Sequence, residues 1–188
     1  KVVIATLPAL VFGLLLDDWI DAHMMNAFVV ALMLILYGIG FLFVEDYKKG
    51  TKPKAERLSQ LTIPMTLAIG GFQVLALIPG TSRSGATILG GLLIGASRAV
   101  AAEFTFFLAI PVMFGASFLK IVKFGFHFTV GEFFLLILGC AVSFGVSVVA
   151  IKFLMGYIKK HDFKVFGWYR IILGILVLGY FVGKTFLA

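Results

Sequence analysis

Long apolar blocks separated by short polar loops dominate the sequence. The blocks at 24–44, 104–119, 133–151 and 171–183 contain no Asp, Glu, Lys or Arg. A helix of about 20 apolar residues crosses the hydrocarbon core of a bilayer, and the shorter blocks gain length from uncharged or interfacial flanks. Together with an apolar segment at 2–16, these blocks predict an all-α polytopic membrane protein with about five spanning helices, organised as a single integral membrane domain.

The region between residues 61 and 97 breaks this pattern. Segment 61–78 is apolar but ends at Pro79-Gly80, and the next apolar stretch, 86–96, has only eleven residues. A helix of that length measures roughly 16 Å, about half of the ~30 Å hydrocarbon core. It is too short to cross alone. The sequence therefore predicts a re-entrant helical hairpin over about 61–97, with its turn at 79–85 near the middle of the membrane.

Composition and charge agree with a membrane protein. Hydrophobic residues make up 61% of the chain and charged residues 13%, whereas a soluble domain carries about 25% charge. The net charge of +7 comes from Lys and Arg in short loops between apolar segments. Membrane orientation explains such loops better than a nucleic-acid partner does.

The loop charges also predict an orientation. A re-entrant hairpin places loops 45–60 and 152–166 and the turn at Arg98 on one face, with ten basic residues. The opposite face holds 17–23 and 120–131, with two. The positive-inside rule predicts that the strongly basic face is cytoplasmic.

The stretch PGTSRSGATI at 79–88 places Arg83 between two apolar segments. An arginine at mid-depth costs at least about 2.5–3.5 kcal/mol, so a functional role is the first interpretation. The alternative is an arginine that reaches an interface or pairs with a buried acid, but the nearest acid in sequence, Glu103, is twenty residues away. The planar guanidinium offers five donors that match phosphate or carboxylate oxygens.

The neighbours of Arg83 supply the rest of an anion site. Gly80 and Gly85 permit close backbone approach, and Ser84 is a suitable N-cap for a helix that starts near Gly85 with free N–H groups. Hydroxyl groups that can donate to an anion come from Thr81, Ser82, Ser84 and Thr87. These residues predict an anion-binding turn, and they leave open whether the anion is moved or cleaved.

Other polar residues favour structural roles. Glu103, near Arg98, is expected in an interfacial salt bridge, and Gln73 in either an interhelical hydrogen bond or a ligand contact. The three histidines are expected to be solvated: His23, His127 and His161. The glycine pairs 91/95 and 179/183 predict close helix packing.

Residues 70–111 resemble a known signature. The core PGTSRSGATI and the following GASRAVAAEFTFFLAIP at 95–111 closely resemble the second signature region of the undecaprenyl pyrophosphate phosphatases, the bacitracin-resistance membrane proteins of bacteria. The remaining helices agree in order and loop length.

The resemblance implies a hydrolase that converts undecaprenyl pyrophosphate to undecaprenyl phosphate, the carrier lipid for wall polymers, in the bacterial cytoplasmic membrane. It implies catalytic roles for Arg83 and Ser82. It also implies that residues of the turn bind the pyrophosphate, namely Gly80, Thr81, Ser82, Arg83, Ser84 and Thr87. An inverted-repeat architecture is expected. The oligomeric state stays open, with a dimer among the options.

The sequence departs from the family at its beginning. The family's first signature, a glutamate-rich stretch followed by serines and a histidine, has no counterpart, because DDWIDAH at 17–23 lacks the serines and glycine before His23. The chain is therefore expected to correspond to the C-terminal two-thirds of such an enzyme. Ligands for a divalent cation, Mg²⁺ or Ca²⁺, are expected in the absent part, as is an attacking serine or water, with Ser82 as the alternative. This chain alone is expected to show little catalysis. The rival interpretation is a transporter or lipid flippase that uses the same anion site without cleavage.

Overall fold

Helices form almost the whole of the protein in the computed structural model, which describes residues 1–125, 129–158 and 160–187. Within these ranges the only strand-like contact is a bridge between Ala55 and Ala96. The helices are α1 (Val2–Met24), α2 (Ala27–Tyr47), α3 (Ile63–Val74), α4 (Arg83–Ile94), α5 (Arg98–Phe124), α6 (Val130–Ile158) and α7 (Lys164–Leu187), with 3-10 turns η1 (Leu58–Gln60) and η2 (Leu75–Leu77). The all-α prediction is confirmed.

Four of these helices, α2, α5, α6 and α7, are long and apolar enough to cross a membrane. The fifth candidate span is α1, which bends between Leu16 and Asp18. The apolar side chains of these helices face outward to a large extent, and none of the apolar window of α6 is buried within the chain. Outward-facing apolar surface of this extent suits lipid rather than water. The protein is therefore a multi-pass membrane protein, as predicted.

The helices extend beyond the charge-free blocks from which they were predicted. Residues 17–23, expected as a connector, are the second arm of α1, and α6 continues seven residues past 151. Likewise, α7 begins at Lys164, inside the predicted loop 152–166. The blocks mark only the part of a helix that lies in hydrocarbon. A helix continues into the headgroup region because its charged side chains reach water there.

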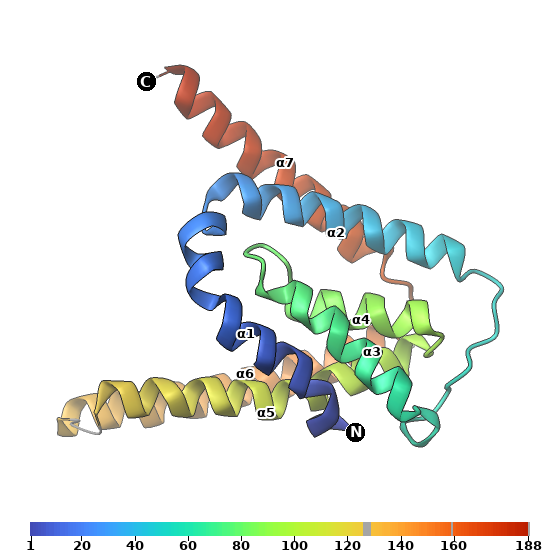
Figure 1. Cartoon of the computed structure of the whole chain (residues 1–188), viewed down its shortest axis with the longest axis horizontal. Helices are drawn as coiled ribbons and strands as arrows, with labels where there is room; N and C mark the ends of the chain where they lie inside the picture. The colour runs from blue at the N-terminus through green and yellow to red at the C-terminus, as the bar shows by residue number, and fades with distance from the viewer. Residues whose placement is uncertain (126–128, 159, 188) are drawn as a thin grey trace.

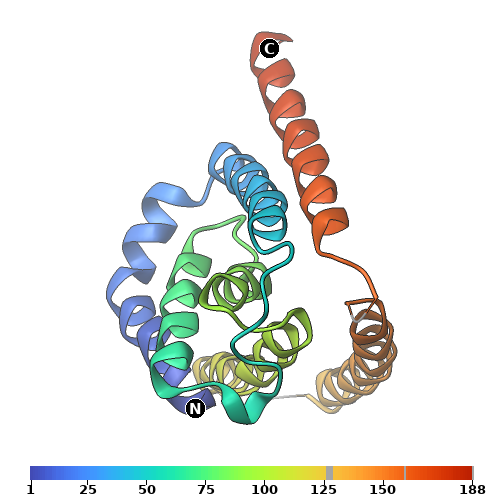
Figure 2. The ribbon, with the colours of Figure 1, turned by 90° about the vertical axis from the view of Figure 1, so that its right-hand side faces the viewer.

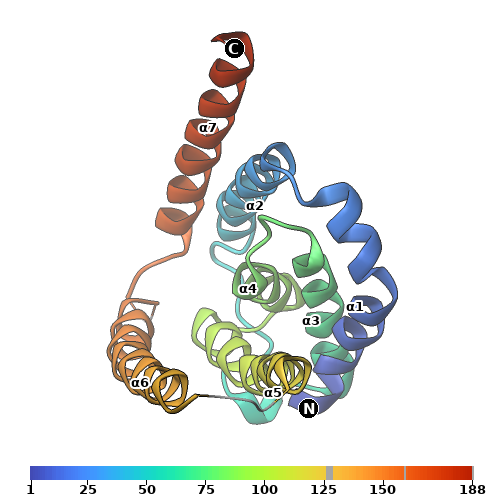
Figure 3. The same cartoon turned by 90° about the vertical axis from the view of Figure 1, so that its left-hand side faces the viewer.

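Helices α3 and α4 form a hairpin whose two open ends lie on the same side of the molecule as the end of α2 (Figure 1). The chain reverses through η2 and residues 78–82. With twelve residues each, the two arms are roughly 18 Å long. Figures 2 and 3 show α4 enclosed by α2, α3 and α5. The re-entrant position of this hairpin in a bilayer stays a prediction.

Small residues allow α4 to be the buried centre of the fold. Every residue from Gly85 to Leu92 is buried. A Cβ atom on Gly90 would lie 2.5 Å from the Phe72 ring, and one on Gly91 would lie 2.9 Å from the Ala101 side chain. The predicted close packing is therefore confirmed for Gly91. It is wrong for Gly95, which instead ends α4 with a φ of 106°.

Close glycine contacts also join α2 to α7, although the two helices are far apart in sequence (Figure 3). A Cβ atom on Gly38 would lie 2.7 Å from the Gly167 carbonyl oxygen, and one on Gly174 would lie 2.9 Å from that of Ala31. The prediction for Gly179 and Gly183 is wrong within the described chain, because neither has an atom within 4 Å of its Cβ position. Glycine spacing alone could not say which face of α7 meets a helix.

The predicted basic face is held together by polar contacts. The buried Glu45 carboxylate accepts hydrogen bonds from the Arg98 guanidinium and from the Phe163 N–H. Nearby, Lys164 pairs with Asp46. These contacts bring the end of α2, the start of α5 and the start of α7 to one side, as the loop charges predicted. The expected salt bridge of Glu103 is wrong for the described residues, since Arg98 uses Glu45 instead.

Candidate active site

The turn of the hairpin packs tightly against α2. The Ile78 carbonyl accepts a hydrogen bond from the Thr81 N–H at 3.1 Å. Between them, Gly80 has a φ of 88°, and a Cβ atom there would lie 2.6 Å from the backbone of Val30. Both the conformation and the space require glycine at this position. The sequence therefore fixes where the following residues enter α4.

Ser82, not Ser84, caps α4. Its Oγ accepts a hydrogen bond from the Gly85 N–H at 3.1 Å, and the helix starts at Arg83, two residues earlier than predicted. The Ser84 hydroxyl lies 3.1 Å from that of Ser82. The backbone N–H groups of Arg83 and Ser84 have no hydrogen-bond partner among the described residues. Free N–H groups at a helix N-terminus favour an anion.

Arg83 stands in the first turn of α4 and has no counter-ion among the described residues. Its Nη1 atom is buried and makes no hydrogen bond within the described chain. The two ion pairs that the structure describes involve Arg98 and Lys164. Pairing with a buried acid, the structural alternative for Arg83, is thus not observed among these residues. A buried guanidinium N–H without a partner is costly, and an anion would satisfy it.

Thr87 lies one turn further into α4 and is almost fully buried. Its hydroxyl donates to the carbonyl of Arg83 at 3.0 Å or of Ser84 at 3.2 Å, and it accepts a hydrogen bond from Thr105 of α5 at 2.9 Å. In this arrangement Thr87 fixes the first turn of α4 against α5. A direct contact of Thr87 with a pyrophosphate stays a prediction.

A second arginine reaches the same region. Arg170 of α7 also has a buried Nη1 without a hydrogen-bond partner, as does the Oγ1 atom of Thr81 in the turn. The Tyr37 side chain of α2 lies beside Thr81 and within electrostatic reach of Arg170. No hydrogen bond of good geometry joins these described side chains. Among the described residues, the unpartnered Thr81 hydroxyl and Arg83 Nη1 atom thus lie at the hairpin turn, and the unpartnered Arg170 Nη1 atom belongs to a side chain near Tyr37, next to the turn.

Arg170 was missed from the sequence because its surroundings suggest another role. It follows Trp168 and Tyr169 near the start of an apolar helix, where an aromatic pair and a cation are typical of the headgroup region. Its place near the hairpin turn becomes visible only when α7 packs on α2, because that packing turns residue 170 toward Tyr37. Sequence separation hides that packing.

Gln73 is the remaining buried polar side chain with no partner. It lies at the end of α3, just before η2, and neither its Nε2 nor its Oε1 atom has a hydrogen-bond partner within the described residues. The interhelical hydrogen bond that was one of its two expected roles is not made there. His23 and His161 are exposed, as predicted, and His127 lies outside the described residues.

The groups at the hairpin turn do not fit a divalent cation by themselves. They are guanidinium, hydroxyl and amide groups, and the unpaired guanidinium charges oppose a second cation. Hard divalent cations need carboxylate or carbonyl oxygens. The described residues also contain no group of three His, Cys, Asp or Glu side chains that could hold a metal ion. The sequence predicted that the cation ligands lie outside this chain, and that prediction stays untested.

The fold and the turn together define a class of protein: a multi-pass membrane protein with a candidate anion site at the tip of a buried helical hairpin. Within that class, the chain belongs to the bacitracin resistance protein BacA family, whose sequence model matches residues 1–176.

Curated relatives carry the name undecaprenyl-diphosphatase. The protein from Desulfitobacterium hafniense is 60% identical over 98% of this chain and 67% of its own length. Two others are 59% identical, from Enterococcus faecalis, and 56% identical, from Streptococcus thermophilus; each match covers at least 95% of this chain and 64% of the relative. The chain thus spans about two thirds of the length of these relatives.

Proposed function

We propose that the protein hydrolyses undecaprenyl pyrophosphate to undecaprenyl phosphate and inorganic phosphate. The proposal rests on one observation above the others: the buried, unpaired Arg83 Nη1 at the start of α4. The names of the relatives supply the substrate. Nothing in the structure favours the alternative of a transporter or flippase.

The hairpin turn holds the pyrophosphate in this proposal. The Arg83 guanidinium takes two phosphate oxygens side by side, which its planar fork permits. The free N–H groups of Arg83 and Ser84 and the dipole of α4 add to the attraction. Gly80 keeps the turn close to α2, so that no side chain stands between the turn and α2.

The reaction adds one water molecule across the anhydride. A P–O bond forms at the terminal phosphorus, the bridging P–O bond breaks, and undecaprenyl phosphate leaves with the bonding electron pair. Negative charge spreads over the oxygens of the transferring phosphoryl group during this step. Arg83, whose Nη1 atom is buried, stabilises that charge from a fixed position in the first turn of α4.

Ser82 serves as a ligand rather than a nucleophile in this proposal. Its oxygen already accepts the Gly85 N–H, and when Ser84 is the donor in the Ser82–Ser84 hydrogen bond, the Ser82 hydroxyl proton can go to a phosphate oxygen. A serine nucleophile needs a base within hydrogen-bond reach, and the described hydrogen bonds of Ser82 include no His, Asp or Glu. The attacking group and the ligands of a divalent cation are proposed to lie in a segment outside this chain.

The lipid tail and the cellular location follow from the same picture. A polyprenyl chain is apolar, and the outward-facing side chains of the spanning helices offer it a surface of matching chemistry. We place the protein in the bacterial cytoplasmic membrane, with the basic face of the loops toward the cytoplasm.

Replacing Arg83 tests the proposal. In the complete protein, Arg83→Ala is expected to lower the rate of phosphate release from undecaprenyl pyrophosphate by about 100- to 1,000-fold, the effect of losing one donor to a developing charge. Arg83→Lys keeps the charge but loses the planar guanidinium group, so its rate of phosphate release is expected to lie between those of the wild type and Arg83→Ala.

The matched control is Arg57→Ala, which removes an exposed arginine from the loop before η1. It should release phosphate at the wild-type rate. Near-wild-type turnover by Arg83→Ala, with folding verified by thermal denaturation, would sink the assignment. Transport of intact lipid without liberated phosphate would favour the transporter instead.

A further inference from the structure

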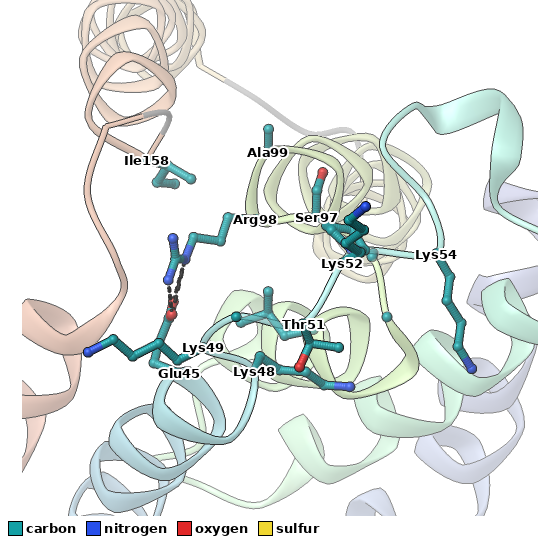
Figure 4. Close-up of a pocket in the computed structure, with 15 residues that line it drawn as sticks. Glu45, Lys48, Lys49, Thr51, Lys52, Lys54, Ser97, Arg98, Ala99 and Ile158 are labelled. Atoms are coloured by element: carbon teal, nitrogen blue, oxygen red, sulfur yellow. Dashed lines mark hydrogen bonds and ion pairs between the residues drawn. The ribbon is translucent and has the colours of Figure 1, made fainter.

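A pocket lined by lysines lies at the opposite end of α4 from the hairpin turn (Figure 4). It has a volume of about 650 Å³ and lies between the end of α2, the loop 48–54 and the turn that joins α4 to α5. Since α4 has twelve residues, roughly 18 Å separates this basic pocket from the turn at Arg83. The two sites are therefore distinct.

Lysines dominate the lining of the basic pocket. Lys48, Lys49, Lys52 and Lys54 all belong to the loop. None of them is in either of the ion pairs that the described residues form. The one carboxylate that lines the pocket, Glu45, is occupied by Arg98 and the Phe163 N–H. The pocket thus carries a net positive charge, and no carboxylate among its described lining residues is left to neutralise the lysines.

The backbone of this loop is fixed against the rest of the fold. The Lys54 N–H donates to the Gly95 carbonyl at 2.7 Å, and the Ser97 N–H donates to the Ala55 carbonyl at 2.9 Å. The Lys54 stem packs over Gly95. A basic loop that served only membrane orientation would need no such anchoring. The anchoring gives the pocket a defined shape before any ligand arrives.

Polar and apolar groups divide the pocket between them. Figure 4 shows Lys48 and Thr51 on one side and Lys52 and Ser97 on the other, with the Arg98–Glu45 pair closing a third. Leu92 and Ile158 add apolar surface. The pocket also lies at the end of α2, a candidate membrane span, and the end of a spanning helix is where lipid headgroups are expected.

We propose that the basic pocket binds the phosphate group of an anionic membrane lipid. Lysine ammonium groups attract anionic headgroups near a membrane surface, and the hydroxyls of Thr51 and Ser97 can donate to phosphate oxygens. The apolar residues accommodate the glycerol and the first methylene groups of the lipid. The same phosphate chemistry could come from free inorganic phosphate, and the test separates the two sources.

The test measures lipid retention by the complete protein. The purified protein is incubated with phosphatidylglycerol or phosphatidylcholine, and bound lipid is counted by native mass spectrometry. The wild type is expected to retain phosphatidylglycerol selectively. The double variant Lys48→Gln/Lys52→Gln is expected to bind it at least about fivefold more weakly, because each lysine contributes to attraction of an anionic lipid.

Two further variants keep the result interpretable. Ser97→Asp preserves the N-cap of α5, since Asp caps as well as Ser, but places a negative charge in the pocket, and it should also weaken lipid binding. The matched control Lys152→Gln/Lys160→Gln removes two exposed lysines near the end of α6, outside the pocket. It should bind like the wild type.

The proposal is overturned by any of three results. These are equal retention of phosphatidylcholine, equal loss in the control variant, and thermal stabilisation by inorganic phosphate that matches that by phosphatidylglycerol at equal concentration. The last would make free phosphate the ligand. None of these readouts uses phosphate release from undecaprenyl pyrophosphate, so the result is independent of the proposed enzyme activity.

Discussion

Buried N–H groups without a partner are rare in folded proteins, because each costs about 1–3 kcal/mol. Within the described chain, Arg83 and Arg170 each keep a buried Nη1 atom in this state, and Thr81 at the hairpin turn keeps a buried hydroxyl without a partner. Such a cluster at one turn is hard to explain by packing alone. A phosphate group held at the turn would offer acceptors to such unpartnered donors, and on this ground we include Arg170 in the proposed site.

Arg170→Ala should therefore weaken substrate binding in the complete protein. A hydrogen bond to a charged group contributes about 1.5–3 kcal/mol, so kcat/KM for undecaprenyl pyrophosphate is expected to fall about 10- to 100-fold, mainly through KM. Arg170→Lys should recover part of the loss, because it keeps the charge. The measurement is steady-state phosphate release over a range of substrate concentrations.

The neighbouring exposed residue provides the control for this experiment. Tyr169→Leu alters the same turn of α7 at a side chain that faces outward, and its KM should match the wild type. If Arg170→Ala left KM unchanged while only lowering thermal stability, Arg170 would be a structural residue and not a substrate ligand.

At the scale of helices, the sequence patterns predicted which helices exist better than they predicted where each helix ends or which helices pack together. The short segment after Pro79 correctly indicated a broken helix, because its length is a direct count. Its cap was misplaced by two residues, since Ser82 and Ser84 are equally good caps by chemistry and only the packing of Gly80 on Val30 selects the first. The pairing of α2 with α7 left no signal, because it depends on glycines more than 120 residues apart.

This pairing makes Gly38 sensitive to substitution. Gly38→Val would force side-chain atoms into the Gly167 carbonyl and Ile171 and push α7 away from α2. Overpacking of this kind costs about 1–3 kcal/mol, measured as a lower free energy of unfolding in a denaturing detergent titration. Because Arg170 lies on α7, phosphate release should fall as well.

Gly179→Ala is the matched substitution on α7. No atom of the described residues lies within 4 Å of its Cβ position, and alanine favours a helix over glycine by up to about 1 kcal/mol. It should be neutral or slightly stabilising. A Gly38→Val variant that unfolds like the wild type would show that α2 and α7 do not pack as closely as described.

At the scale of the whole molecule, the two ends of α4 have different roles. Its N-terminal end carries the proposed catalytic turn, and its C-terminal end lies at the basic face, where the ends of α2, α5 and α7 meet. Loop charges alone predicted that these ends share a side. The loop charges could not predict that the buried Glu45 carboxylate joins the ends of α2, α5 and α7. The sequence pattern assigned Glu45 to a loop, whereas in the structure it lies inside α2.

Glu45 should therefore contribute to stability far more than its neighbour Asp46, although both are acids at the end of the same helix. Glu45 is 3% exposed, and Glu45→Ala leaves the Arg98 guanidinium and the buried Phe163 N–H without their acceptor. The expected loss in free energy of unfolding is about 1–3 kcal/mol, toward the low end for the arginine because its side chain is partly in contact with water. Asp46→Ala breaks only the exposed pair with Lys164, so the unfolding transition should scarcely move. A double-mutant cycle with Arg98→Ala measures the coupling directly. Equal effects of the two substitutions would mean that the basic face is held together by charge in general and not by the Glu45 carboxylate.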